Sequence, residues 1–149
     1  MNKLILALAI CIGLAACGNN NAKKNDTVKV EQTQSQKVND HVEILYFHGK
    51  QRCATCMAIE KNAKEAIEAQ FAEEMKNGSV VFKAIDISQP ENEKIAEKYE
   101  VTWSSLFISK WKDGKEISEN LTEYAFANAR KNPEVFKSEI TTKVRTALK

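Results

Sequence analysis

Apolar positions along the chain predict alternating strands and helices from about residue 40 onward. Residues 41–48 form a nearly continuous apolar run, as expected for a buried strand, and Gly49 ends it. Between residues 53 and 76 apolar side chains recur every four positions, the spacing of one helix face, until Gly78 provides a stop signal. Residues 79–87, rich in valine and isoleucine, predict a second strand. The predicted helix face consists of Ile59, Ala63, Ile67, Phe71 and Met75.

In the second half of the domain, the apolar spacing and the turn signals predict a short helix, a hairpin and two closing helices. Ser88-Gln89-Pro90-Glu91 has the pattern of a capping box that opens the short helix. Segments 106–111 and 115–118 flank Asp113-Gly114, a strong signal for a two-residue hairpin turn, and residues 121–130 predict an added amphipathic helix. The last helix has Asn132 as its expected N-cap, Pro133 at its first position, and a face of Phe136, Ile140, Val144 and Ala147.

Residues 1–16 have the pattern of a secretory signal peptide. Asn2 and Lys3 precede an apolar run that ends in small residues and is short for a membrane-spanning helix. The sequence Leu14-Ala15-Ala16-Cys17 resembles the lipobox of bacterial lipoproteins, which implies that Cys17 carries the lipid and becomes the mature N-terminus. An ordinary signal peptide that contains a cysteine is the alternative. From this pattern we expect an exported, lipid-anchored protein that faces the periplasm. Because Gly18 rather than aspartate follows Cys17, the outer membrane is slightly favoured.

Residues 17–39 have a composition that predicts a flexible tether between the lipid and a folded domain. They are rich in Asn, Lys, Gln, Ser and Thr and hold too few apolar residues to form a core. Residues 40–149 are long enough for one domain, which we expect to be a monomer. The formal net charge is +2, and lysine alternates with glutamate instead of clustering, so nucleic acid is not an expected partner.

Two cysteines remain for chemistry in the predicted mature domain, because Cys11 leaves with the signal peptide and Cys17 takes the lipid. Outside the cytosol, Cys53 and Cys56 can cycle as a redox-active disulfide. Cys53 falls at a predicted helix start, where free backbone amides and the helix dipole lower the pKa of a thiol, and Arg52 adds positive charge. Cys53 is therefore the predicted nucleophile, and Cys56, one turn further in, is the predicted resolving thiol.

The element order, together with Cys53-Ala54-Thr55-Cys56, resembles the thioredoxin fold. The resemblance covers roughly residues 42–148, and Tyr99, Val101 and the segment 113–115 support it more weakly. It implies an α/β, thioredoxin-like three-layer fold, in which a central mixed β-sheet is flanked by helices. It also implies a thiol-disulfide oxidoreductase that needs no organic cofactor.

The chain departs from the thioredoxin pattern at three positions. Arg52 stands where the family usually has tryptophan, and Phe47 stands where it has a buried aspartate that helps move the proton of the resolving thiol. Ser105 occupies the place of the usual cis-proline, so we expect a trans peptide bond there, because a cis bond before serine costs several kcal/mol. Trp103 precedes this loop and either covers the dithiol or packs within the loop and hairpin.

Two other readings of the cysteine pair remain open. Cys53 and Cys56 with His48 could bind copper or zinc, although a structural zinc site usually needs a second pair of ligands. An inert structural disulfide is the other reading. The sequence thus favours a periplasm-facing oxidoreductase acting on a protein dithiol or disulfide and recharged by a membrane redox partner. The alternative is a non-catalytic thioredoxin-like module that binds a partner protein or a metal ion through the same cysteines.

Overall fold

The computed structural model describes residues 40–149, so the expected signal peptide, Cys17 and the tether lie outside the described residues. In the described part no helix has the length and apolar character needed to cross a membrane. The elements, in chain order, are β1 (His41–His48), α1 (Ala54–Gln70), α2 (Ala72–Asn77), β2 (Val80–Asp86), a 3-10 turn η1 (Pro90–Asn92), α3 (Glu93–Lys98), β3 (Ser105–Lys112), β4 (Lys115–Asn120), α4 (Thr122–Asn128) and α5 (Pro133–Ala147).

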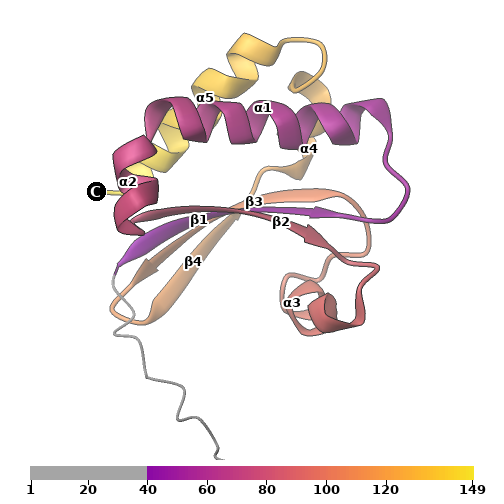
Figure 1. Ribbon diagram of the computed structural model, residues 1–149, viewed down its shortest axis with the longest axis horizontal. Helices are drawn as coiled ribbons and strands as arrows, with labels where there is room; N and C mark the ends of the chain where they lie inside the picture. Colours follow the sequence, from indigo (N-terminus) through magenta and orange to yellow (C-terminus); the bar gives the residue numbers. More distant parts are fainter. Residues whose placement is uncertain (1–39) are drawn as a thin grey trace, which may run out of the picture. The chain divides into compact units, whose positions relative to one another are not determined.

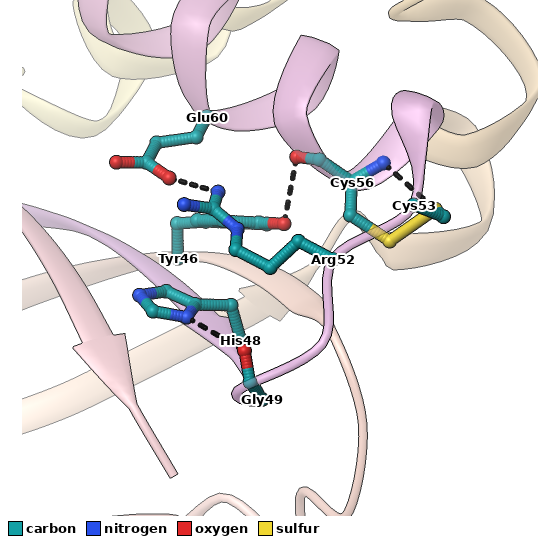
Figure 2. Close-up of a disulfide and its surroundings, with 7 residues drawn as sticks. All are labelled: Tyr46, His48, Gly49, Arg52, Cys53, Cys56 and Glu60. Atoms are coloured by element: carbon teal, nitrogen blue, oxygen red, sulfur yellow. Dashed lines mark hydrogen bonds and ion pairs between the residues drawn. A yellow bond between two sulfur atoms is a disulfide. The ribbon is translucent and has the colours of Figure 1, made fainter. Parts of the chain in front are cut away.

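The four strands form one mixed sheet in the order β2-β1-β3-β4 (Figure 1). β1 and β2 are parallel, whereas β3 is antiparallel to both of its neighbours, β1 and β4. The chain leaves the carboxyl end of β1 and enters α1 through residues 49–53, so the first turn of this helix stands beside that end of the sheet (Figure 2). The hairpin turn has Asp113 at φ 51° and Gly114 at φ 73°, as the Asp-Gly signal predicts.

Alternate residues of β1 supply two cores, one on each face of the sheet. Val42, Ile44 and Tyr46 are buried together with residues of α1 and α5, whereas Leu45 and Phe47 are buried with a smaller cluster that α3 covers. Figure 1 shows α1, α4 and α5 on one side of the sheet and α3 on the other. The expected α/β fold class, a central mixed sheet with helices on both faces, is confirmed.

The single helix predicted over residues 53–76 is wrong, because it is broken at Phe71. Phe71 has φ −134° and ψ 33°, which ends α1 and allows α2 to begin. An apolar residue every four positions drifts about 40° per step around a straight helix, so a straight helix cannot bury the whole series. The break lets Phe71 lie 2% exposed in the main core with Met75 packed against it.

The predicted capping box at Ser88 is also wrong. The backbone N–H and the hydroxyl of Ser88 both donate to Asp86 Oδ1, at 3.0 and 2.7 Å, so its side chain closes a turn after β2 instead of capping a helix. Pro90 opens η1, and α3 follows with no side-chain cap. Asn132 does precede Pro133 at the start of α5, but its side chain makes no capping hydrogen bond.

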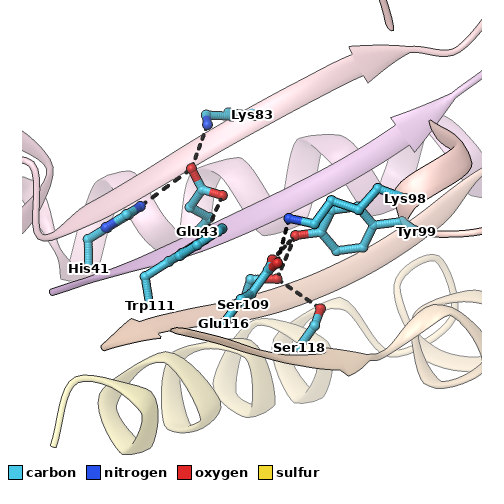
Figure 3. A network of polar contacts seen from close by, with 9 residues as sticks. All are labelled: His41, Glu43, Lys83, Lys98, Tyr99, Ser109, Trp111, Glu116 and Ser118. Atoms are coloured by element: carbon cyan, nitrogen blue, oxygen red, sulfur yellow. Dashed lines mark hydrogen bonds and ion pairs between the residues drawn. The ribbon is translucent and has the colours of Figure 1, made fainter. Parts of the chain in front are cut away.

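A polar network ties α3 to the hairpin on the face of the sheet that α3 only partly covers (Figure 3). The Tyr99 hydroxyl is 2.9 Å from Ser109 Oγ and also donates to the carboxylate of Glu116, which lies 2.5 Å from Lys98 Nζ. Burial and the Glu116 hydrogen bond raise the pKa of Tyr99. Burial acts to raise the pKa of Glu116, but hydrogen bonds from Lys98, Tyr99 and Ser109 outweigh it, so that pKa lies below its ordinary value.

We predict that Glu116→Gln lowers the free energy of unfolding by about 1 kcal/mol at pH 7. A carboxylate whose pKa is depressed in the folded state stabilises the fold above its unfolded pKa, and this contribution disappears as the pH falls through the folded pKa. The difference between the two proteins should therefore shrink below about pH 4. Urea titrations at pH 7 and pH 3 measure it. Glu119, on the same strand as Glu116, forms a more exposed ion pair with Lys143, so Glu119→Gln is the control and should change the free energy of unfolding little. A loss of stability in Glu116→Gln that persists at pH 3 would contradict the assignment.

Candidate active site at Cys53 and Cys56

Cys53 is the N-cap residue of α1 and is joined to Cys56 by a disulfide. Its backbone is extended, with φ −77° and ψ 164°, and its Sγ accepts a hydrogen bond from the Cys56 backbone N–H at 3.0 Å. The two Cα atoms are 5.0 Å apart. The Cys53 sulfur therefore occupies the place where a capping oxygen usually satisfies a free amide at the positive end of a helix dipole.

The two cysteines differ in their access to solvent. Cys53 is exposed, whereas Cys56 is only 7% exposed and lies in the first turn of α1 against the sheet. A molecule in solution therefore has more access to Cys53 than to Cys56. This asymmetry is what an attacking and a resolving thiol require.

Arg52 turns away from the sulfurs and pairs with Glu60 (Figure 2). Its guanidinium also lies over the Tyr46 ring, with Cζ 5.6 Å from the ring centroid, and its Nε is buried without a hydrogen-bond partner. Burial works against the charge on Arg52, but hydrogen bonding to Glu60 and Tyr46 and the charge of Glu60 outweigh this, so its pKa lies above the ordinary value. The positive charge expected to support the Cys53 thiolate is thus already paired with a carboxylate.

Tyr46 is a site residue that reasoning from the sequence missed. Its side chain is fully buried, and its hydroxyl donates to the backbone carbonyl of Cys56 at 2.8 Å. In the sequence it belongs to the apolar run of β1 and resembles any core aromatic. The available signal was that a buried phenol needs a hydrogen-bond partner and that this strand leads directly to the cysteines.

His48 does not join the cysteines in a metal site. Its Nδ1 lies 3.1 Å from the carbonyl oxygen of Gly49, and its ring stacks on Tyr46 with centroids 5.9 Å apart. Among residues 40–149 no three His, Cys, Asp or Glu side chains gather closely enough to hold a metal ion. The geometry therefore does not favour the copper or zinc alternative built on His48, Cys53 and Cys56.

The loop before β3 meets the same end of the sheet as the dithiol. Ser105 is paired with Phe47 in the β1-β3 register, is 5% exposed, and donates from Oγ to the Trp103 carbonyl at 3.1 Å. No cis peptide bond occurs within residues 40–149, so the expected trans bond before Ser105 is confirmed. Trp103 is 57% exposed and contacts Phe126 of α4, with ring centroids 5.2 Å apart. The contact with α4 thus covers part of the Trp103 side chain, and the remainder faces solvent.

No family model matches the chain, and no curated protein sequence is detectably similar to it. Solved structures with a similar fold include a thioredoxin from Thermus thermophilus, 18% identical with a TM-score of 0.43, where the match covers 71% of this chain and 72% of that one. Chloroplastic thioredoxin z is 18% identical with a TM-score of 0.41, covering 70% and 81% of the two chains. A structure described as a malarial protein is 16% identical with a TM-score of 0.38, covering 58% and 93%.

At such identities and TM-scores the likeness carries no conclusion about this chain. The thioredoxin-like description follows from this chain's own features, namely the mixed sheet, the helices on both faces and a Cys-X-X-Cys disulfide at the start of α1. Together these features form a redox-type module.

We predict that iodoacetamide modifies Cys53 at least about ten times faster than Cys56 in the reduced, folded protein. Cys53 is exposed at a helix N-terminus, whereas Cys56 is nearly inaccessible. Mass spectrometry of peptides after a short reaction with limiting reagent measures the two rates. The same reaction in concentrated urea is the control, in which both thiols should react at similar rates; equal rates in the folded protein would contradict the asymmetry.

Proposed function

We propose that this protein is an exported, lipid-anchored thiol-disulfide oxidoreductase that acts on protein disulfides through Cys53 and Cys56. The observation that carries the proposal is the exposed residue Cys53 at the N-cap of α1, bonded through its sulfur to a shielded partner in the first turn of the helix. A disulfide that only stabilised the fold would gain little from closing so short a loop. Its position at a helix tip serves exchange chemistry better than stability.

The reaction proceeds in two exchange steps. The Cys53 thiolate attacks one sulfur of a substrate disulfide, which breaks that bond, forms a mixed disulfide and releases one substrate thiolate. The Cys56 thiolate then attacks the Cys53 sulfur, which closes the protein disulfide and releases the second substrate thiolate. The substrate gains two electrons and the protein dithiol loses two. A dithiol reductant, which we propose to be a membrane redox partner, restores the reduced protein.

The thiolate of Cys53 is stabilised mainly by the helix terminus. The Cys56 backbone N–H already points at the Cys53 sulfur, and it would donate to a thiolate in the same place. Arg52 contributes less than its position in the sequence suggests, because Glu60 holds its guanidinium. Ser105, the first residue of β3, and Trp103, in the loop before it, lie at this end of the sheet, where they would border a bound substrate chain.

The proposed location depends on the N-terminal sequence. The apolar run of residues 4–16 followed by Ala15-Ala16-Cys17 supports export and lipid attachment at Cys17, and residues 18–39 have the composition of a tether. In an oxidising compartment a dithiol of this kind meets exported proteins with disulfides to exchange. The rival reading is a module that binds a partner through the same face without turnover, and trapping separates the two.

We predict that Cys56→Ser accumulates covalent adducts between Cys53 and substrate proteins, because the mixed disulfide can no longer be resolved. Non-reducing gels and mass spectrometry of a cell-envelope fraction detect these adducts and identify the partners. Reduction of insulin disulfides by dithiothreitol should fall to the uncatalysed rate in this variant.

Cys53→Ser is the matched control for trapping. It keeps a thiol in the same motif, but that thiol is shielded, so we expect neither adducts nor catalysis. If neither variant forms adducts and the wild-type protein does not accelerate insulin reduction, the binding-module reading replaces the enzyme.

We predict that Cys17→Ser abolishes labelling of the protein by a fatty-acid analogue and releases it from the membrane fraction, because the thiol is the proposed acylation site. Metabolic labelling followed by fractionation measures both effects. Cys11→Ser is the control, since this cysteine lies inside the proposed signal peptide and should leave labelling unchanged. Persistent labelling of Cys17→Ser would disprove the anchor.

A further inference from the structure

Hydrogen bonds connect the interior of β1 to the backbone of both cysteines. The Tyr46 hydroxyl donates to the Cys56 carbonyl at 2.8 Å. The N–H of the same peptide group belongs to Met57 and donates to the Cys53 carbonyl at 3.0 Å. The preceding amide, the Cys56 N–H, donates to Cys53 Sγ. The backbone around the resolving thiol is therefore fixed on both sides.

Tyr46 is well placed to hold this backbone firmly. Its side chain is fully buried, so water does not compete for its hydroxyl, and hydrogen bonds in such surroundings polarise one another. The Arg52 guanidinium lies over the Tyr46 ring and is itself held by Glu60 (Figure 2). Arg52 and Glu60 come from the loop before α1 and from its second turn, so the cluster joins β1, this loop and the helix.

We propose that Tyr46 is the positioning residue for the resolving step, in which it keeps the Cys56 sulfur within reach of Cys53 while a substrate is attached. This proposal rests on the exchange reaction proposed above and adds to it the residue that controls ring closure. Attack by Cys53 on a substrate occurs in the exposed part of the site and does not depend on where Cys56 lies. Closure of the protein disulfide depends on the effective concentration of one sulfur at the other.

Tyr46→Phe tests this role, because it removes the hydroxyl and retains the buried ring. We expect the rate at which Cys53 captures glutathione disulfide to stay within about twofold of wild type. Resolution of the resulting mixed disulfide should slow about threefold to tenfold. The equilibrium constant for forming the Cys53–Cys56 disulfide in glutathione buffers should fall by a similar factor, which for tenfold corresponds to about 30 mV in reduction potential.

Tyr99→Phe is the matched control. Tyr99 is a partly buried tyrosine whose hydroxyl, like that of Tyr46, is hydrogen-bonded, here to Ser109 and Glu116, but it lies on the opposite face of the sheet. It should lose stability in urea titrations and leave capture, resolution and the glutathione equilibrium unchanged. A positioning role thus changes the balance between oxidised and reduced forms, whereas a structural role changes only the stability of the fold.

The proposal is overturned if Tyr46→Phe is less stable but resolves mixed disulfides at the wild-type rate, or if capture and resolution slow equally. Should Tyr46→Phe not fold, 3-fluorotyrosine at this position keeps the ring and supplies a stronger donor. Resolution and the glutathione equilibrium should then shift in the opposite direction, and unchanged values would contradict the proposal. If the wild-type protein neither accelerates insulin reduction nor forms adducts with proteins, the proposed function fails, while capture of glutathione disulfide and the glutathione equilibrium still test Tyr46.

Discussion

The site depends on a single constraint, the start of a helix at a cysteine. Because Cys53 takes the N-cap position of α1, its sulfur receives the free amide of Cys56 and stands at the positive end of the helix. The same geometry turns Cys56 inward by one turn and buries it. Exposure of one sulfur, shielding of the other and their mutual reach all follow from where this helix begins, and β1 fixes that place because its last residues lead directly into the loop.

Much of the scaffold could be predicted from the sequence because strong periodic signals determine it. The apolar run of β1, the Asp113-Gly114 hairpin and the closing helix after Pro133 all appear where expected. The position of Cys53 near a helix start could also be predicted, since the strand ends at Gly49 and apolar residues at helical spacing follow from Ile59. These are local signals, in which the residue and the structure it forms are close together in the chain.

The features that could not be predicted depend on contacts between distant residues. The break at Phe71 lets its ring lie buried in the main core, and the turn at which the helix breaks depends on the elements that form this core. Ser88 is an exception, because its partner is only two residues away: its backbone N–H and hydroxyl donate to Asp86 Oδ1, and the capping-box pattern does not exclude such a turn. Arg52 pairs with Glu60 and lies over the Tyr46 ring instead of turning to Cys53, the next residue in the sequence, since the loop directs its side chain along the helix.

The alternation of β1 also explains how the site works without the buried acid of the thioredoxins it resembles. Phe47 points into the cluster under α3, so a carboxylate at that position would lie on the opposite face from Cys56. Tyr46 is the residue that faces the helix, and it holds the resolving cysteine through a backbone carbonyl instead of its sulfur. Glu60, the carboxylate that belongs to this cluster, is paired with Arg52. In the mechanism that we propose, control of ring closure thus passes from an acid that moves a proton to a neutral donor that fixes the backbone.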